Sequence, residues 1–338
     1  MPLPPLYPPS RVPALNRRQL LAAGAGLGLA SALPHLHAQT GWPSKSIRFV
    51  VPFAPGGSSE IIARSTAAEL SKNLGHNVYV DNKPGAAGNI AMSEVARADD
   101  QHTVILGHIG TLAVNPYIFP KLPYDPNKDF RPVSLLAKVP SLYVVHPDFP
   151  AKNLREFVAY VRANPGKFSY GSAGNGSAGH LAFEYLKATA NLYMLHVPYK
   201  GTGPMMTDLL SGRLDAASVG ASALLPFIKS GKLRCIATGS TQRLAQLPDV
   251  PTVAEQGFAG FEMTQWYGML APATLQAAHV ERLAAECQKA VRAPDALKRL
   301  QGDAADPMGG TPAEFARFIA AEQARWKQVL LRAQVKPD

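Results

Sequence analysis

Serine, histidine and glycine residues at the ends of strand-like segments are the candidates for chemistry in this 338-residue chain. The segment Gly174-Asn-Gly-Ser-Ala-Gly179 follows a strand-like run and leads into a helical pattern, so it has the glycine spacing of a dinucleotide-binding turn. Such a turn also needs an acidic residue at the end of the next strand to hold the ribose. That strand ends Val197-Pro-Tyr-Lys200 and has no acidic residue. We therefore predict an anion-friendly helix start and no nucleotide site.

Ser177 and His180 also raise the question of nucleophilic catalysis. The turn around Ser177 resembles a nucleophile elbow only loosely, because no Gly-x-Ser-x-Gly segment occurs. None of the 9 histidines lies in a His-Glu-x-x-His or paired metal-binding spacing, so no metal and no cofactor is expected. His180 is as well explained by packing or exposure as by ligand contact. Without an acid–base pair the pattern favours binding, and an exported α/β hydrolase using Ser177 and His180 is the alternative.

The stretch Ile47–Arg64 places a glycine turn between a strand and a helix. Ile47–Phe53 is an apolar run typical of a buried strand, Gly56 and Gly57 break it, and helical spacing follows from Glu60. Unpaired N–H groups and the helix dipole converge at such a corner and favour an anion. An ordinary βα turn is the alternative for this stretch taken alone.

Similar corners recur at strand ends along the chain. Because open α/β folds bind ligands at the carboxyl edge of the sheet, their accumulation indicates a binding site. Exposure of Lys200 and packing of Trp266 and Tyr267 are the simpler interpretations of those three residues. The corners are Gly56-Gly57, Gly110-Thr111, Gly174–Gly179, Tyr199–Gly201 and Gly220.

The first residues predict an export signal. Arg17 and Arg18 precede the short apolar run Leu20–Leu33, and a small-residue cleavage site ends at Ala38. Loss of residues 1–38 removes three arginines and lowers the formal charge from +10 to +7. The remaining basic residues are scattered, which argues against nucleic acid as a partner. The general and twin-arginine export routes both remain open, and the mature chain is expected in the periplasm.

Alternating strand and helix signals predict an α/β fold with mostly parallel sheets and helices on both faces. Strand-rich crossings near residues 133–145 and 261–271, with two strands bracketing Pro140, divide the chain into two series. We predict one domain from residues 41–139 plus 266–338 and a second from residues 140–265. Cys235 and Cys287 are expected to be unrelated buried thiols, although an oxidising compartment would allow them to pair.

Ten ordered motifs between Trp42 and about Val335 give the chain a resemblance to the substrate-binding proteins of the tripartite tricarboxylate transporters, the Bug family of periplasmic receptors. The motifs are WPSKSIRFVVPFAPGG, DNKPGAAGNI, GTLAVNP, KLPYDPNKDF, YGSAGNGSAGHLA, HVPYKGTGP, IKSGKLR, LPDVPTVAEQG, WYGMLAP and GGTPAEFARFI.

The resemblance implies a two-domain clamshell of the type II periplasmic-binding architecture, whose domains are joined by two strand crossings and close on a ligand. It implies a receptor without enzymatic activity, expected to be a monomer, that delivers a small organic carboxylate to integral-membrane permease subunits. Presentation of the ligand to a sensor kinase is an alternative. Carried over by position, the ligand contacts would be Phe53, Pro55, Gly56, Gly57, Ser58, Ser59, Glu60, His108, Gly110, Thr111, Gly174, Asn175, Ser177, Ala178, His180, Tyr199, Val219, Gly220 and Ala221.

Two departures from the family pattern bear on the ligand. Glu60 stands where the family usually has Asp, and Val219-Gly220 stands where it often has Asp-Asn. Glu60 can be explained as a cap of the first helical turn. Loss of the second acid makes the cleft more apolar. We therefore expect a carboxylate with an apolar or aromatic body rather than citrate.

Overall fold

The computed structural model describes residues 41–333. The export signal predicted over residues 1–38 lies outside this range. One compact unit that begins at Lys45 holds all the helices and strands described below. None of the helices within residues 41–333 combines the length and the apolar character needed to span a bilayer.

The first series of elements forms a parallel sheet in which β1 lies between β2 and β3. Gly75 ends the first helix at a φ of 69°, the left-handed conformation that glycine adopts without strain. The predicted helix after Gly110 is divided into a π-helical turn and a short α-helix. The elements are β1 (Ile47–Val51), α2 (Ser58–Leu74), β2 (Val78–Asn82), η2 (Ala86–Gly88), α3 (Asn89–Ala96), β3 (Thr103–His108), η3 (Gly110–Val114) and α4 (Asn115–Ile118).

Two long strands, β4 (Phe130–Val145) and β9 (Thr264–Pro272), pair antiparallel in the middle of the sheet. The prediction that two strands bracket Pro140 was wrong, because β4 runs through it. Pro140 is opposite Thr264 at the end of the β9 ladder, and pairing with β7 starts at Ser141. The proline therefore stands where β4 changes partners, so its missing N–H does not interrupt either ladder.

The second series repeats the alternation of strand and helix. Its strand β5 pairs parallel with β6 and β7, while β7 and β8 pair antiparallel with β4. A capping box opens α5, where the Asn153 side chain accepts a hydrogen bond from the Glu156 N–H. The elements are α5 (Leu154–Ala163), β5 (Ser169–Ser172), α6 (Ala178–Ala190), β6 (Leu195–Pro198), α7 (Thr202–Leu210), β7 (Ala216–Gly220), α8 (Ala221–Lys229), β8 (Arg234–Thr238) and η4 (Ala254–Gln256).

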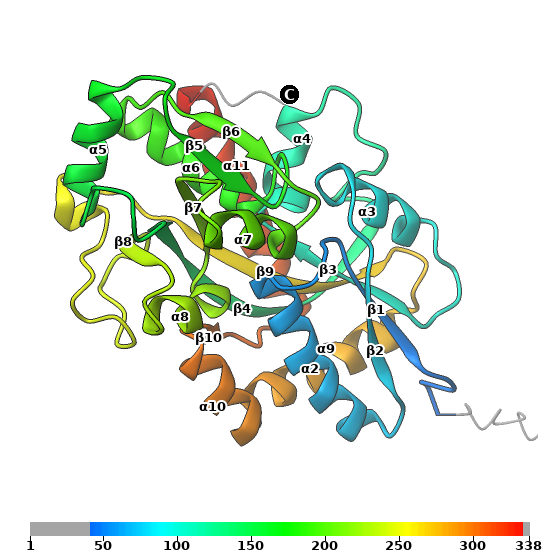
Figure 1. Ribbon diagram of the computed structural model, residues 1–338. Helices are drawn as coiled ribbons and strands as arrows, with labels where there is room; N and C mark the ends of the chain where they lie inside the picture. The colour runs from blue at the N-terminus through cyan, green and yellow to red at the C-terminus, as the bar shows by residue number, and fades with distance from the viewer. Residues whose placement is uncertain (1–40, 334–338) are drawn as a thin grey trace, which may run out of the picture. The chain divides into compact units, whose positions relative to one another are not determined.

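The strand order β2-β1-β3-β9-β4-β7-β5-β6 places β2 and β6 at opposite edges (Figure 1), while β8 and β10 (Asp306–Pro307) pair with β4. The α/β prediction is confirmed, with one refinement. Parallel pairing is confined to the two outer groups of strands, and the strands around β4 and β9 pair antiparallel. The domain boundaries near residues 140 and 265 remain a prediction.

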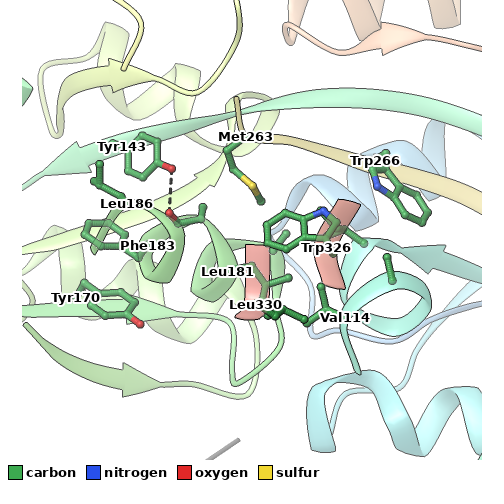
Figure 2. Packing of buried hydrophobic residues seen from close by; sticks show 14 of the residues in the cluster. Val114, Tyr143, Tyr170, Leu181, Phe183, Leu186, Met263, Trp266, Trp326 and Leu330 are labelled. Carbon is green, nitrogen blue, oxygen red and sulfur yellow. Dashed lines mark hydrogen bonds between the residues drawn. The ribbon is translucent and has the colours of Figure 1, made fainter. Parts of the chain in front are cut away.

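Three helices, α9 (Ala277–Arg292), α10 (Pro294–Gly302) and α11 (Pro312–Ala333), follow the last long strand. Helix α9 lies beside α2, as Figure 1 shows, whereas α11 contacts β4, η3 and also α6 of the second series. Figure 2 shows Trp326 and Leu330 beside Val114 and Leu181. The last helix therefore packs on both series of elements.

Aromatic side chains fill much of the core, and most of their polar atoms form hydrogen bonds. The Tyr143 hydroxyl donates to the Ala182 carbonyl at 2.9 Å (Figure 2). Cys235 and Cys287 are free thiols, in agreement with the expectation that they are unrelated, but only Cys287 is fully buried and Cys235 is half-buried. Desolvation raises the pKa of both thiols, so neither forms a thiolate readily near neutral pH.

Candidate functional site

The first turns of α2 and α6 meet at one cavity of about 30 Å³. A single water requires about 10–15 Å³ of such space, so the cavity in this conformation admits water but no larger molecule. We call it the carboxylate cavity, after the ligand that the sequence resemblance implies. Its lining residues come from both series and from β9, and they are Phe53, Gly57, Ser58, Ser59, His108, Ala173, Ser177, Ala178, Gly179, Thr202, Ser218, Val219, Gln265 and Tyr267.

The start of α2 supplies backbone donors to this cavity. Gly57 is the cap residue of this helix and has no side chain that could accept hydrogen bonds from the first turn. The N–H groups of that turn therefore remain available to a ligand. Ser58 and Ser59 are buried in that turn. The helix dipole adds partial positive charge at the same place.

Three buried polar atoms at the cavity lack a hydrogen-bond partner among the described residues. They are Ser58 Oγ, Ser218 Oγ and His108 Nε2. Each of these three residues is 2% exposed or less. Unpartnered buried polar atoms are costly and uncommon in native proteins. Their convergence on one cavity marks it as a place where a polar ligand would supply the missing partners.

The hydrogen bonds of His108 fix its tautomer. The Thr111 N–H donates to His108 Nδ1 at 3.0 Å, so Nδ1 is an acceptor and the ring proton is on Nε2. Burial lowers the pKa of His108 to about 3, which keeps the ring neutral. His108 is therefore a neutral N–H donor at the cavity, and the hydrogen bond from the Thr111 N–H to Nδ1 fixes the orientation of its ring.

This depressed pKa predicts a pH dependence of stability. Unfolding restores the ordinary pKa near 6.5, so between about pH 6.5 and 3 the unfolded chain binds the proton and the folded chain does not. Above pH 6.5, His108 should not affect the free energy of unfolding. As the pH is lowered from 6.5 towards 3, that free energy should fall by up to about 1.4 kcal/mol per pH unit. Urea unfolding measured across this pH range should show that the free energy of unfolding depends less steeply on pH in His108→Asn than in the wild type. The Asn Oδ1 can still accept the hydrogen bond from the Thr111 N–H. Equal slopes for the two proteins would contradict this assignment.

No lysine or arginine is among the described residues that line the carboxylate cavity. An anion there would be held by hydroxyls, backbone N–H groups and the neutral imidazole. On the β9 side, the Tyr267 hydroxyl donates to Gln265 Oε1 at 2.6 Å, and Gln265 Nε2 donates to Ser141 Oγ at 3.0 Å. This chain of hydrogen bonds fixes the wall of the cavity.

The structure brings part of the predicted site together. Phe53, Gly57, Ser58, Ser59, His108, Ser177, Ala178 and Val219 line the carboxylate cavity. A second, neighbouring cavity is lined by Phe53, Gly174, Asn175 and Tyr199. The predicted residues that line neither cavity are Pro55, Gly56, Glu60, Gly110, Thr111, His180, Gly220 and Ala221.

Glu60 serves the backbone of the turn. Its Oε2 accepts from the Gly56 N–H at 2.8 Å, and its Oε1 accepts from Arg64 Nε at 2.7 Å. The carboxylate thus holds the glycine turn and pairs with the next helical turn. This is the capping role, and the longer side chain fulfils it outside the cavity.

His180 is not arranged as a base for Ser177. Its Nδ1 accepts from the Gly176 N–H at 3.2 Å, and its ring lies 4.4 Å from that of His196. Ser177 Oγ accepts from the His180 backbone N–H as the cap of α6. Both side chains therefore shape the glycine turn that faces the cavity.

Sequence reasoning missed five residues of the carboxylate cavity. Ser218 and Thr202 lie beside predicted strand ends, and that proximity was the available signal. Tyr267 was assigned to packing, but the β3–β9 register places it opposite His108. The five are Ala173, Thr202, Ser218, Gln265 and Tyr267.

Comparison with known proteins matches residues 62–334 to a family model described as "Tripartite tricarboxylate transporter family receptor". A protein of Pseudomonas sp. strain P51, named "UPF0065 protein in tcbD-tcbE intergenic region", is 37% identical over 96% of each chain. Protein BugT of Bordetella pertussis is 32% identical over 95% of this chain and 99% of its own.

Solved structures agree with the sequence relatives. One described as a periplasmic transporter has a TM-score of 0.85 and 40% identity, over 88% of this chain and all of its own. Rpa4515 of R. palustris, solved with adipate, has a TM-score of 0.85 and 34% identity over the same shares. MatC of Rhodopseudomonas palustris, with bound malate, has a TM-score of 0.81 and 34% identity over 86% of this chain and all of its own.

The family and these neighbours are substrate-binding receptors, which overturns the hydrolase alternative. The matched length and the shared fold lead to one conclusion. This chain belongs to the tripartite tricarboxylate transporter receptor family.

Proposed function

We propose that this chain is a periplasmic receptor that holds a small carboxylate in the carboxylate cavity and delivers it to the permease subunits of a tripartite tricarboxylate-type transporter. Export with cleavage near Ala38 belongs to the same proposal. The observation that carries it is the convergence of Ser58 Oγ, Ser218 Oγ and His108 Nε2, all buried and unpartnered, on one cavity at a helix start. The adipate and malate bound by two relatives support the ligand class.

Closure of two domains fits the same proposal. With domain boundaries near residues 140 and 265, the cavity walls come from both domains, and β4 and β9 are the crossings between them. A carboxylate larger than water enters when these walls separate and is enclosed when they return.

The wall chemistry favours a ligand with an apolar or aromatic body. Val219 lines the cavity where the family pattern often places an acid, and Phe53 faces it from the other series. Citrate would place additional carboxylates against these apolar side chains.

Calorimetry on protein freed of co-purified ligand tests the proposal. We expect binding of at least one acid among malate, adipate, benzoate and citrate, with citrate not preferred, and no binding of the matching neutral amide. Failure of every acid, or equal binding of the amide, would contradict carboxylate recognition. Tight citrate binding without benzoate binding would contradict only the expectation that the ligand has an apolar or aromatic body.

Serine variants locate the binding site. Ser58→Ala and Ser218→Ala should each weaken binding by about ten- to a hundredfold, because a hydrogen bond to a charged group contributes about 1.5–3 kcal/mol. Ser65→Ala is the matched control, since Ser65 is on the same helix, is 2% exposed and also has an unpartnered Oγ, but lies away from the cavity. An equal loss for Ser65→Ala would remove the assignment of the site.

A further inference from the structure

An open groove of about 560 Å³ lies between residues 65–72 of α2 and residues 295–303 at α10. The two helices pack side by side, as Figure 1 shows. The groove shares no lining residue with the carboxylate cavity or with the cavity that adjoins it. We call it the α2–α10 groove, and it is a separate surface of the molecule.

Small side chains leave room between the two helices. Ala68 on α2 and Gly302 on α10 are exposed, and a Cβ at Gly302 would meet no atom within 4 Å. Ser65, which also lines the groove, is 2% exposed, and its Oγ has no hydrogen-bond partner among the described residues. Buried hydroxyls without a partner are uncommon in native proteins. A molecule seated in the groove would supply the missing partner.

Charged side chains of both signs line the same groove. Glu69 and Lys72 form an ion pair with each other at 2.7 Å. Burial raises the pKa of the Asp303 carboxyl, although two nearby basic side chains act in the opposite direction, so its charge is incompletely compensated. Two acids and two bases at α10 form no ion pair with another described residue, and they are Asp295, Lys298, Arg299 and Asp303. The groove therefore suits an occupant that carries charges of both signs.

The open shape favours a protein segment over a small molecule. Small-molecule sites bury most of the ligand surface, whereas Lys72, Lys298 and Arg299 of this groove are exposed. A helix or turn of a partner can lie between two neighbouring helices, where small residues allow a close approach. A second copy of this chain fits less well, because a two-fold contact would bring one concave surface against another.

Helix α2 connects the groove to the carboxylate cavity. Ser58 in its first turn lines that cavity, and Ser65 follows seven residues later, about 10 Å along the helix axis. A partner that holds the groove therefore holds the helix whose first turn faces the ligand. Among possible partners, the permease that receives this ligand has the most direct use for such a contact.

We propose that the α2–α10 groove is the docking site for a segment of the permease that carries both acidic and basic side chains. This inference rests on the proposed function and deepens it by naming the surface that the permease contacts. Because the groove and the carboxylate cavity share no lining residue, changes in the groove should alter delivery and leave ligand affinity unchanged.

Uptake by spheroplasts tests the docking site. Spheroplasts of the host strain, with the receptor gene deleted, are supplied with purified receptor and with the radiolabelled acid of the calorimetric panel that wild type binds most tightly. The receptor concentration that gives half-maximal uptake measures docking. Ala68→Trp fills the groove and should raise that concentration about tenfold or more. The double variant Lys298→Glu with Arg299→Glu should raise it similarly, because it removes both basic partners at α10.

Ala285→Trp is the matched control, since Ala285 is exposed on α9 and lines neither the groove nor the two cavities. It should leave the half-saturating concentration unchanged. Calorimetry should give every variant the ligand affinity of the wild type, which also shows that each is folded.

The outcomes separate this inference from the proposed function. Wild-type protein that binds no acid of the panel, or binds one without supporting its uptake, would overturn the proposed function itself. Normal ligand binding with an unchanged half-saturating concentration in Ala68→Trp and in the double variant would overturn the docking site alone. So would a loss of ligand affinity that accounts for the loss of uptake. Sedimentation that shows wild-type dimers dispersed by Ala68→Trp would assign the groove to a second copy and overturn the permease as its occupant.

Discussion

Alanine at Gly203 is expected to weaken carboxylate binding by about ten- to a hundredfold while the protein remains folded. Gly203 lies in the first turn of α7, and a Cβ there would be 2.8 Å from the Pro55 carbonyl oxygen. The same contact region contains the parallel bridge between Ala54 and Gly201. An added methyl group forces these backbones apart and displaces the turn that positions Ser58, at a cost of about 1–3 kcal/mol.

The change should not harm the helix itself, because alanine has a higher helix propensity than glycine. Gly302→Ala is the matched control, since Gly302 ends α10 and a Cβ there would meet nothing within 4 Å. Thermal unfolding should show both variants folded, and calorimetry should show weaker binding for Gly203→Ala only. Unchanged affinity in Gly203→Ala would show that contact between these backbones is not needed for binding.

Among the variants proposed for this protein, Trp266→Ala is expected to lose the most stability, about 3–5 kcal/mol in the free energy of unfolding. Trp266 is 1% exposed and joins β9 to α11. Its ring meets those of Phe315 and Phe318 edge-on, at 6.2 and 5.2 Å between centroids. Its Nε1 donates to Glu322 Oε2 at 2.7 Å, so truncation also removes a partner from a carboxylate that is only 8% exposed.

Phenylalanine variants isolate the hydrogen bond from the packing. Trp326 is equally buried at 1% exposed, but its Nε1 has no partner among the described residues. Trp266→Phe should therefore cost more than Trp326→Phe, by about 1.5–3 kcal/mol for a hydrogen bond to a charged group. Urea unfolding of both variants measures the difference. Equal losses would show that the Glu322 hydrogen bond contributes nothing net.

Local features were predictable because neighbouring residues determine them. The turn around Gly56 and the helix start at Ser177 depend on residue types within a few positions. The structure places both as expected. The ordered family motifs then predicted which of the turns belong to one site.

Features set by long-range pairing were not predictable from local patterns. Tyr267 reaches the carboxylate cavity because β9 pairs with β3. The residues next to Tyr267 in the sequence do not specify the register of that pairing. Pro140 signalled a break, yet β4 continues because the strand changes partners at that residue. Glu60 resembled a ligand contact by position, while its length directs it to Gly56 and Arg64.

A crystal structure of the protein with the tightest-binding acid of the calorimetric panel tests the account most directly. The account predicts one carboxylate within hydrogen-bond distance of Ser58 Oγ, Ser218 Oγ and His108 Nε2, with no lysine or arginine in contact with it. A carboxylate bound elsewhere, or held in this cavity by a cationic side chain while those three atoms stay unpartnered, would contradict it.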